Sequence, residues 1–314
     1  MKIAAVVIGR NEGARLIACL EALQGRVGQI VYVDSGSTDG SVAAAKSAGA
    51  QVIPLDMTRP FTASRARNAG LAALEDGIEY VQLLDGDCVL RDGWLETAEA
   101  FLDENPKAAV ACGRRRERHP EASIYNTLID DEWDTPIGQA KACGGDALMR
   151  VTALRDVGGY RETLIAGEEP ELCLRLRQAG WTVWRLDAEM TWHDAALTRF
   201  GQWWQRSKRA GHAFAEGAFL HGAAPERHWV AETRRALLWG AVLPLGIFCC
   251  AFLISPWALF LSAVYVVQVL RLSRHRSFSW AFFTVLGKFP EALGALSFYV
   301  SRMRGRRTQI IEYK

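Results

Sequence analysis

Two aspartates separated by one glycine, Asp85-Gly86-Asp87, directly follow a short apolar segment of the chain. Carboxylates at positions i and i+2 can bind a divalent cation directly or through water, and Mg²⁺ and Mn²⁺ prefer such oxygen ligands. A cation bound there can bridge the phosphates of a nucleotide diphosphate and stabilise the charge that develops as the diphosphate leaves. The triplet is also good turn chemistry, so on its own it predicts either a metal site or a solvated turn.

The segments around this triplet alternate between strands and helices. Four apolar runs predict strands, at residues 3–8, 29–33, 51–55 and 80–84. This alternation is typical of a doubly wound, mostly parallel sheet of the α/β class. Such sheets bind ligands at the carboxyl ends of their strands. Three polar loops follow strands at that edge, at residues 10–12, 34–39 and 85–87.

The following part of the chain has a mixed pattern of strands and helices. It predicts helices at residues 94–104 and 170–180 and strands at residues 108–113 and 182–186. We expect this half of the domain to shape the site for a second substrate.

Composition narrows the class of protein. The chain has 314 residues, half of them hydrophobic, which is enough for one large α/β domain and a further region. With 37 basic and 35 acidic residues, its net charge of +2 does not favour a nucleic-acid-binding protein. The seven cysteines lack CxxC spacing, which argues against a disulfide framework or a zinc site and fits a reducing cytosolic compartment. The first apolar run is too short for a signal peptide.

The last third of the chain has the composition of a membrane anchor. Two charge-free apolar segments, separated by a Ser-Pro break, lie at residues 236–254 and 257–270. The first has the ~20 residues that a helix needs to cross a bilayer. Basic residues flank the pair, which places both ends on the cytoplasmic side. The segment 278–300 carries a lysine and a glutamate at its centre, so we expect an interfacial or re-entrant amphipathic helix. The alternative is a buried hairpin in a soluble domain.

Five short motifs follow one another along residues 3–215. They lie at residues 10–12, 33–40, 66–70, 85–87 and 167–172. In order and spacing they resemble the inverting family 2 glycosyltransferases of the GT-A fold, in a membrane-anchored bacterial form. The resemblance implies a catalytic domain at residues 1–215, followed by a membrane-anchoring region at residues 216–314. It also implies Mg²⁺ or Mn²⁺ as cofactor and a nucleotide diphosphate sugar as donor.

The resemblance also implies which side chains bind the donor. They are Arg10, Glu12, Asp34, Arg65, Arg67, Asn68 and Asp85. Asp34 would accept hydrogen bonds from the base or ribose, and Glu12 would reach the same nucleoside. Arg65 or Arg67 would neutralise the diphosphate, the alternative for each being an exposed helix charge. Asn68 would contact the donor or cap its loop. The family usually has a second aspartate where this chain has Ser35, which leaves the base of the nucleotide open.

The metal and the general base follow from the same resemblance. Asp85, Asp87 and His193 would hold the cation, although a histidine beside a tryptophan is often structural. An inverting transfer needs a base that deprotonates the acceptor hydroxyl. Glu169 aligns with the family's usual aspartate, and Glu168 remains a second candidate. Both acids would also favour a helix N-terminus without any catalytic role.

Together these features predict the transfer of one sugar to a lipid-linked or saccharide acceptor. The reaction would occur at the cytoplasmic face of the inner membrane, in cell-surface polysaccharide or glycolipid synthesis, with membrane lipids and no nucleic acid as partners. About two spanning helices are too few for a polymer channel. The segment that contains Asp146 resembles the family's acceptor-site loop, in which Asp146 would bind an acceptor hydroxyl, or it is a plain turn. The alternatives are a catalytically degenerate membrane scaffold and a nucleotidyltransferase-like nucleotide-binding protein.

Overall fold

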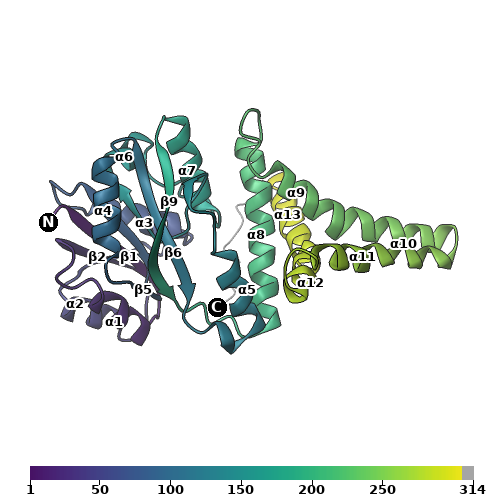
Figure 1. The fold of residues 1–314 in the computed structure, drawn as a ribbon, viewed down its shortest axis with the longest axis horizontal. Coiled ribbons are helices and arrows are strands. Elements are labelled where there is room, and N and C mark those ends of the chain that lie inside the picture. The colour runs from purple at the N-terminus through teal and green to yellow at the C-terminus, as the bar shows by residue number, and fades with distance from the viewer. Residues whose placement is uncertain (306–314) are drawn as a thin grey trace. The chain divides into compact units, whose positions relative to one another are not determined.

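The computed structural model describes residues 1–305 (Figure 1). The chain forms two compact units. Unit 1 consists of Met1–Leu164 and Glu168–Ala196, and unit 2 of Ile165–Gly167 and Leu197–Lys314. Unit 1 contains the sheet and unit 2 is helical.

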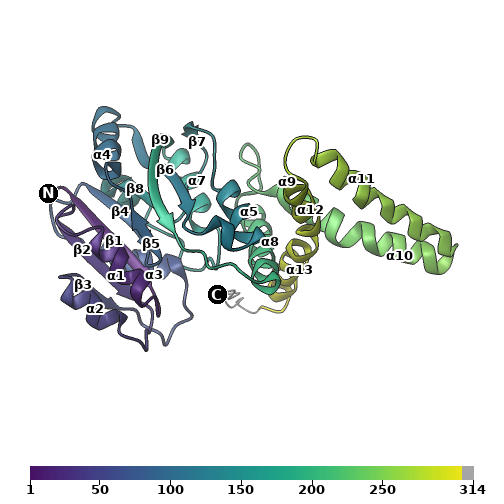
Figure 2. The ribbon, with the colours of Figure 1, turned by 60° about the horizontal axis from the view of Figure 1, so that its bottom comes forward.

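Unit 1 is built on one mixed sheet with the strand order β3-β2-β1-β4-β8-β6-β9-β5, and β7 pairs with β9 (Figure 2). The strands are β1 (Ile3–Gly9), β2 (Gln29–Asp34), β3 (Gln51–Pro54), β4 (Tyr80–Asp85), β5 (Cys88–Leu90), β6 (Ala108–Glu117), β7 (Gly138–Ala140), β8 (Ala147–Arg150) and β9 (Thr182–His193). The four strands β1 to β4 are all parallel, as predicted. β8 is antiparallel to both β4 and β6. The predicted α/β class is therefore confirmed.

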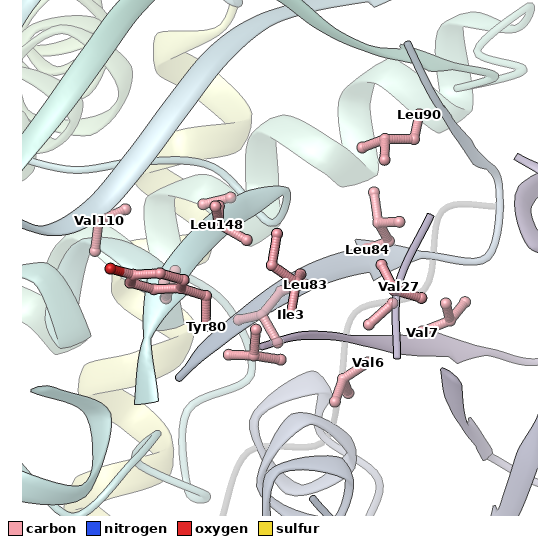
Figure 3. Packing of buried hydrophobic residues seen from close by; sticks show 14 of the residues in the cluster. Ile3, Val6, Val7, Val27, Tyr80, Leu83, Leu84, Leu90, Val110 and Leu148 are labelled. Carbon is pink, nitrogen blue, oxygen red and sulfur yellow. The ribbon is translucent and has the colours of Figure 1, made fainter. Parts of the chain in front are cut away.

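The helices of unit 1 cover this sheet. They are α1 (Ala14–Glu21), α2 (Ser41–Ser47), α3 (Ala63–Ala72), α4 (Trp94–Glu104), the 3-10 helix η1 (Pro120–Ala122), α5 (Ile124–Glu132), α6 (Val151–Asp156) and α7 (Glu168–Gln178). Val6, Leu83 and Leu148 are among the buried side chains of the core, which Figure 3 shows from nearby. Helix α3 approaches β1 closely because Gly70 has no side chain, and a Cβ there would overlap Val6. This close packing fixes the position of the charged residues of α3.

Strand β9 is longer than the sequence predicts, ending at His193 instead of residue 186. Its second half alternates apolar with polar residues and is paired with β6 through several register shifts. The alternation itself indicates a strand, but the register shifts, and with them the pairing partner of this extension, are not visible in the sequence. The extension carries His193 to the short strand β5, which directly follows Asp87.

Unit 2 consists of helices. They are α8 (Phe200–His221), α9 (Val230–Leu237), the π-helix η2 (Leu238–Val242), α10 (Leu243–Leu253), the 3-10 helix η3 (Pro256–Ser262), α11 (Ala263–Leu272), α12 (Phe278–Leu286) and α13 (Lys288–Met303). Among residues 1–305, one continuous helix, Val230–Leu253, is long and apolar enough to cross a membrane. The shorter apolar helix Pro256–Leu272 follows it, and Figures 1 and 2 both show α10 and α11 side by side.

The segment at 278–300 differs from the expectation of a single helix. It comprises α12 and α13, which meet at Gly287. Helix α13 packs along α8 through glycines, since a Cβ on Gly211 would overlap the backbone of Glu291. A Cβ on Gly294 would likewise overlap the carbonyl of Lys208. The two helices therefore touch backbone to backbone.

Adding a methyl group at this crossing is expected to destabilise unit 2. Gly211→Ala places a Cβ against the backbone of Glu291, so the helices have to separate, at a cost of about 1–3 kcal/mol. Gly201→Ala is the matched control in the same helix, because nothing lies within 4 Å of a Cβ there. Thermal unfolding in detergent should show a lower midpoint for Gly211→Ala alone. Equal midpoints for the two variants would contradict the close crossing.

Candidate active site

Arg67 of α3 lies at the centre of a buried cluster of charges. One of its nitrogens, Nη2, lies 2.9 Å from Asp85 Oδ1. The other, Nη1, lies 2.6 Å from Glu169 Oε1 and 3.3 Å from Glu168 Oε1. Only 3% of the Arg67 side chain is exposed. The guanidinium of Arg67 therefore links the end of β4 to the start of α7 and faces three carboxylates.

The surroundings of Glu169 tune its proton affinity. Burial raises the pKa of Glu169 to about 7, Arg67 opposes the rise, and the charges of Glu168 and Asp85 add to it. Burial acts to lower the pKa of Arg67, but the carboxylates, Glu169 foremost, raise it above its ordinary value. Arg67 stays charged, whereas Glu169 exchanges its proton near neutral pH. Such a carboxylate suits general base catalysis.

Asp87, Cys88 and His193 form a second buried cluster. Their ligand atoms all lie within 4.8 Å of one another, with 3.3 Å between His193 Nε2 and Asp87 Oδ1. Cys88 and His193 face each other across the antiparallel pair β5 and β9, and the rings of His193 and Trp133 form a T-shaped contact. Carboxylate and imidazole ligands suit a divalent cation such as Mn²⁺. Asp85 is not part of this set.

Cys88 is a member that sequence reasoning missed. The signal available was its position next to Asp87, but a single cysteine without CxxC spacing does not predict a ligand. Its partner His193 is distant in sequence and reaches it only through the irregular end of β9.

The residues expected around the nucleoside shape the loops after β1 and β2. Asp34 Oδ2 accepts hydrogen bonds from the backbone N–H groups of Gly36 and Ser37, at 3.1 and 3.0 Å. Glu12 forms an ion pair with Arg15, and Arg10 is exposed. Since Asp34 pairs with Gly9 in register, Arg10, Glu12 and Asp34 belong to adjacent loops at the carboxyl edge of the sheet.

Arg65 and Asn68 hold loops in place. Arg65 is buried and donates hydrogen bonds to the backbone carbonyls of Asp56, Arg59 and Pro60. Asn68 exchanges hydrogen bonds with the backbone of Tyr160, through both its oxygen and its nitrogen. Neither side chain joins the Arg67 cluster. Asn68 is expected either to contact the donor or to cap its loop. Its hydrogen bonds in unit 1 are those of a residue that holds a loop.

The loop with Asp146 passes directly over the Arg67 cluster. A Cβ on Gly145 would lie 2.8 Å from Arg67 Nη2 and 3.1 Å from Asp85 Oδ2, so only glycine fits without a shift. Asp146 itself is fully buried. Its carboxylate pairs with Arg115 at 2.7 Å and accepts a hydrogen bond from Thr191 at 2.7 Å. Asp146 therefore braces the site, and Arg115 is a further residue that the sequence did not reveal.

Comparison with known proteins shows what this fold and these clusters resemble. Residues 5–155 match the model of glycosyl transferase family 2. The matched range includes β1 to β4, Arg67, Asp85 and Asp87. This stretch, just under half of the chain, therefore resembles glycosyl transferase family 2, and the chain has a GT-A-like fold.

Individual relatives are distant. The chain is 25% identical over 269 residues to the succinoglycan biosynthesis protein ExoA of Rhizobium meliloti, covering 77% of this chain and 81% of that protein. It is 28% identical over 228 residues to the pre-mycofactocin glycosyltransferase of Mycobacterium tuberculosis, covering 69% of this chain but only 47% of the relative. The mannosyltransferase PcManGT from Pyrobaculum calidifontis, solved in complex with GDP-Man and Mn²⁺, has a similar fold with a TM-score of 0.65. That match, at 19% identity, covers 94% of this chain and 87% of the solved one.

Proposed function

We propose that this protein is a glycosyltransferase that transfers a single sugar, with inversion, from a nucleotide diphosphate sugar to a lipid-linked or saccharide acceptor. The observation that carries the proposal is the Arg67 cluster. There one buried guanidinium forms ion pairs with Asp85 and with the Glu168-Glu169 pair. Asp85 lies two residues before Asp87 in the chain. A diphosphate, a cation and a general base are the three components that such a transfer requires.

The donor site would lie along the carboxyl edge of the sheet. Asp87 and His193 are the proposed ligands of Mg²⁺ or Mn²⁺, with Asp85 completing the Asp-x-Asp motif toward the donor. When bound, the cation stabilises the charge of the leaving diphosphate. Arg10, Glu12 and Asp34 would receive the nucleoside, while Arg65 and Asn68 keep the surrounding loops in shape. The solved complex of PcManGT, a protein of similar fold, contains GDP-Man and Mn²⁺, which supports a nucleotide-sugar donor and a divalent cation here.

Glu169 is the proposed general base, and Glu168 is the second candidate. In an inverting transfer the base accepts the proton of the acceptor hydroxyl as its oxygen attacks the anomeric carbon opposite the diphosphate. Glu169 is buried, and burial raises its pKa to about 7, so it can accept a proton at neutral pH. Its ion pair with Arg67 orients the carboxylate.

The rate of transfer is expected to rise with pH through the pKa of Glu169, which burial raises to about 7. Only the ionised carboxylate can accept the proton, so activity is lost as pH falls. Glu168→Gln removes a negative neighbour that raises this pKa, so its profile should shift to lower pH. The measurement is the rate against pH at saturating donor. An unshifted profile in Glu168→Gln would contradict Glu169 as base, and complete loss of activity would favour Glu168.

Unit 2 would attach the enzyme to the cytoplasmic face of the inner membrane. We propose that residues 216–314 contain the anchor, with the helix Val230–Leu253 crossing the bilayer and Pro256–Leu272 returning. Large apolar side chains of this hairpin face outward, among them Phe248, Phe252, Trp257 and Phe260. An apolar surface of this kind marks a membrane contact. The anchor supports a lipid-linked acceptor, and the name of ExoA supports a role in polysaccharide synthesis.

The proposal is tested by incubating the full chain in vesicles of bacterial lipid extract with Mn²⁺ and a panel of radiolabelled nucleotide sugars. One donor should transfer its label to lipid or lipid-linked saccharide. Asp87→Asn should abolish transfer, whereas Asp92→Asn, an exposed acid beyond β5, should retain it. In a parallel incubation with a nucleoside triphosphate and a sugar 1-phosphate, formation of a nucleotide sugar with release of pyrophosphate would instead favour a nucleotidyltransferase. No turnover of any donor would favour a scaffold.

A further inference from the structure

Cys88 adds a sulfur atom to the pair that the proposed function assigns to the cation. Its Sγ lies 3.7 Å from Asp87 Oδ1, which in turn lies 3.3 Å from His193 Nε2. All three residues are buried, so the three ligand atoms are enclosed by protein. Cys88 and His193 are cross-strand partners, and such residues project from the same face of a sheet.

The two distances fit a four-coordinate cation. Metal–nitrogen, metal–oxygen and metal–sulfur bonds of about 2.0–2.3 Å place tetrahedral ligands about 3.3–3.8 Å apart. The separations of 3.3 and 3.7 Å lie in this range, and all three ligand atoms lie within 4.8 Å of one another. Three protein ligands leave one position for water or a phosphate oxygen, as in other catalytic metal sites.

The surroundings keep this cluster in place without help from the thiol. Asp146, whose Oδ1 lies 3.5 Å from Cys88 Sγ, is held independently by Arg115 and Thr191. Its carboxylate therefore does not need Cys88 as a hydrogen-bond donor. The thiol itself donates to Asp146 Oδ1 and Asp87 Oδ1, and it can exchange these weak hydrogen bonds for a metal bond while Arg115 and Thr191 still hold Asp146.

We propose that Cys88 is a third protein ligand and makes this metal site selective for thiophilic divalent cations. Zn²⁺, Cd²⁺ and Co²⁺ would then bind in preference to Mg²⁺, because thiolate ligands select softer ions. On coordination the S–H bond is exchanged for a metal–sulfur bond, and the proton leaves to solvent. This inference rests on the proposed function only in taking Asp87 and His193 as the other two ligands.

The first test is spectroscopic and does not depend on activity. The full chain in detergent is titrated with Co²⁺, and the sulfur-to-cobalt charge-transfer absorption in the near ultraviolet is recorded. The wild type should show the band and Cys88→Ser should lose it. Cys143 and Cys173, with sulfurs 3.6 Å apart, could also bind a soft ion, so Cys173→Ser is the matched control. This variant should keep the band. Loss of the band in Cys173→Ser but not in Cys88→Ser would overturn the proposal.

Calorimetry gives the selectivity. Cys88→Ser should bind Cd²⁺ at least ~10-fold more weakly than the wild type, while its affinity for Mg²⁺ changes less than ~2-fold. If Cys88→Ser does not fold, the ¹¹³Cd chemical shift of Cys173→Ser, which lacks the competing cysteine pair, decides alone. A shift in the range of sulfur-bound cadmium supports the proposal, and a shift typical of oxygen and nitrogen ligands overturns it.

The failure of this inference differs from the failure of the proposed function. Nucleotide diphosphate binding that needs Mg²⁺ but gives no sulfur signal with Co²⁺ or Cd²⁺ would refute only the role of Cys88. A sulfur signal without any metal-dependent nucleotide binding would support Cys88 as a ligand and refute the transferase site.

Discussion

Arg67→Ala is expected to destabilise unit 1 by about 3–5 kcal/mol, since removing one partner of a buried ion pair leaves uncompensated charge. Three carboxylates, those of Asp85, Glu168 and Glu169, then face one another without the guanidinium that joins them. The measurement is chemical unfolding of the solubilised chain. A loss below about 1 kcal/mol, the value of an exposed pair, would contradict the central place of Arg67.

The pH dependence of this defect separates charge from packing. Protonation of Glu169, whose pKa burial raises to about 7, removes one of the repelling charges, so the difference in stability between Arg67→Ala and the wild type should shrink as pH falls below about 7. A packing defect would not change with pH. Combining Arg67→Ala with Glu169→Gln should recover part of the lost stability, because one of the repelling charges is gone. Arg67→Ala should also fail to bind a nucleotide diphosphate, provided it is folded at the pH of the experiment.

Glu169→Gln is expected to slow transfer by about 10²–10⁴-fold, the usual contribution of a general base, while making the protein more stable at alkaline pH. The folded pKa of about 7 lies above the ordinary value of 4.5, mainly because of burial. An acid whose pKa is higher in the folded than in the unfolded state lowers the stability of the protein as the pH rises from the unfolded-state pKa to the folded-state pKa. Above the folded pKa the cost reaches about 3 kcal/mol, and glutamine removes it.

The stability of Glu169→Gln should therefore exceed that of the wild type above about pH 7 and match it at acidic pH. Thermal unfolding at both pH values gives the comparison, and donor binding confirms that the site is intact. Glu168→Gln is the matched control, as it changes the neighbouring acid and should keep most of the activity. An active Glu169→Gln, or one less stable at alkaline pH, would contradict the role assigned to this buried carboxylate.

The sequence predicts the half of the fold in which each strand carries a continuous apolar run. Strands β1 to β4 are of this kind, and parallel pairing brings the loops with Asp34 and Asp85 to one edge. Arg67 and Asp85 are close for the same reason, because α3 packs on β1 and points its charged residues toward that edge. A regular pattern in sequence is enough where pairing is local and regular.

The second half of the fold is harder to predict from the sequence, because its contacts depend on irregular, long-range strand pairing. The end of β9 joins β6 through register shifts, which no alternation of apolar residues reveals. Cys88 meets His193, and Arg115 meets Asp146, only once these strands are assembled. For Arg65 the sequence leaves open a diphosphate contact or an exposed charge, and for Asn68 a donor contact or a loop cap, because a sequence does not say whether a polar side chain turns to a ligand or to the backbone.

The most direct test of the central claim is isothermal titration of the solubilised chain with UDP, GDP and dTDP, in Mn²⁺ and in EDTA. Metal-dependent binding of one of the three is predicted for the wild type and Asp92→Asn, and no binding for Asp87→Asn. Binding that survives EDTA or Asp87→Asn, or no binding of any nucleotide, would contradict a metal-dependent nucleotide-sugar site at this edge of the sheet.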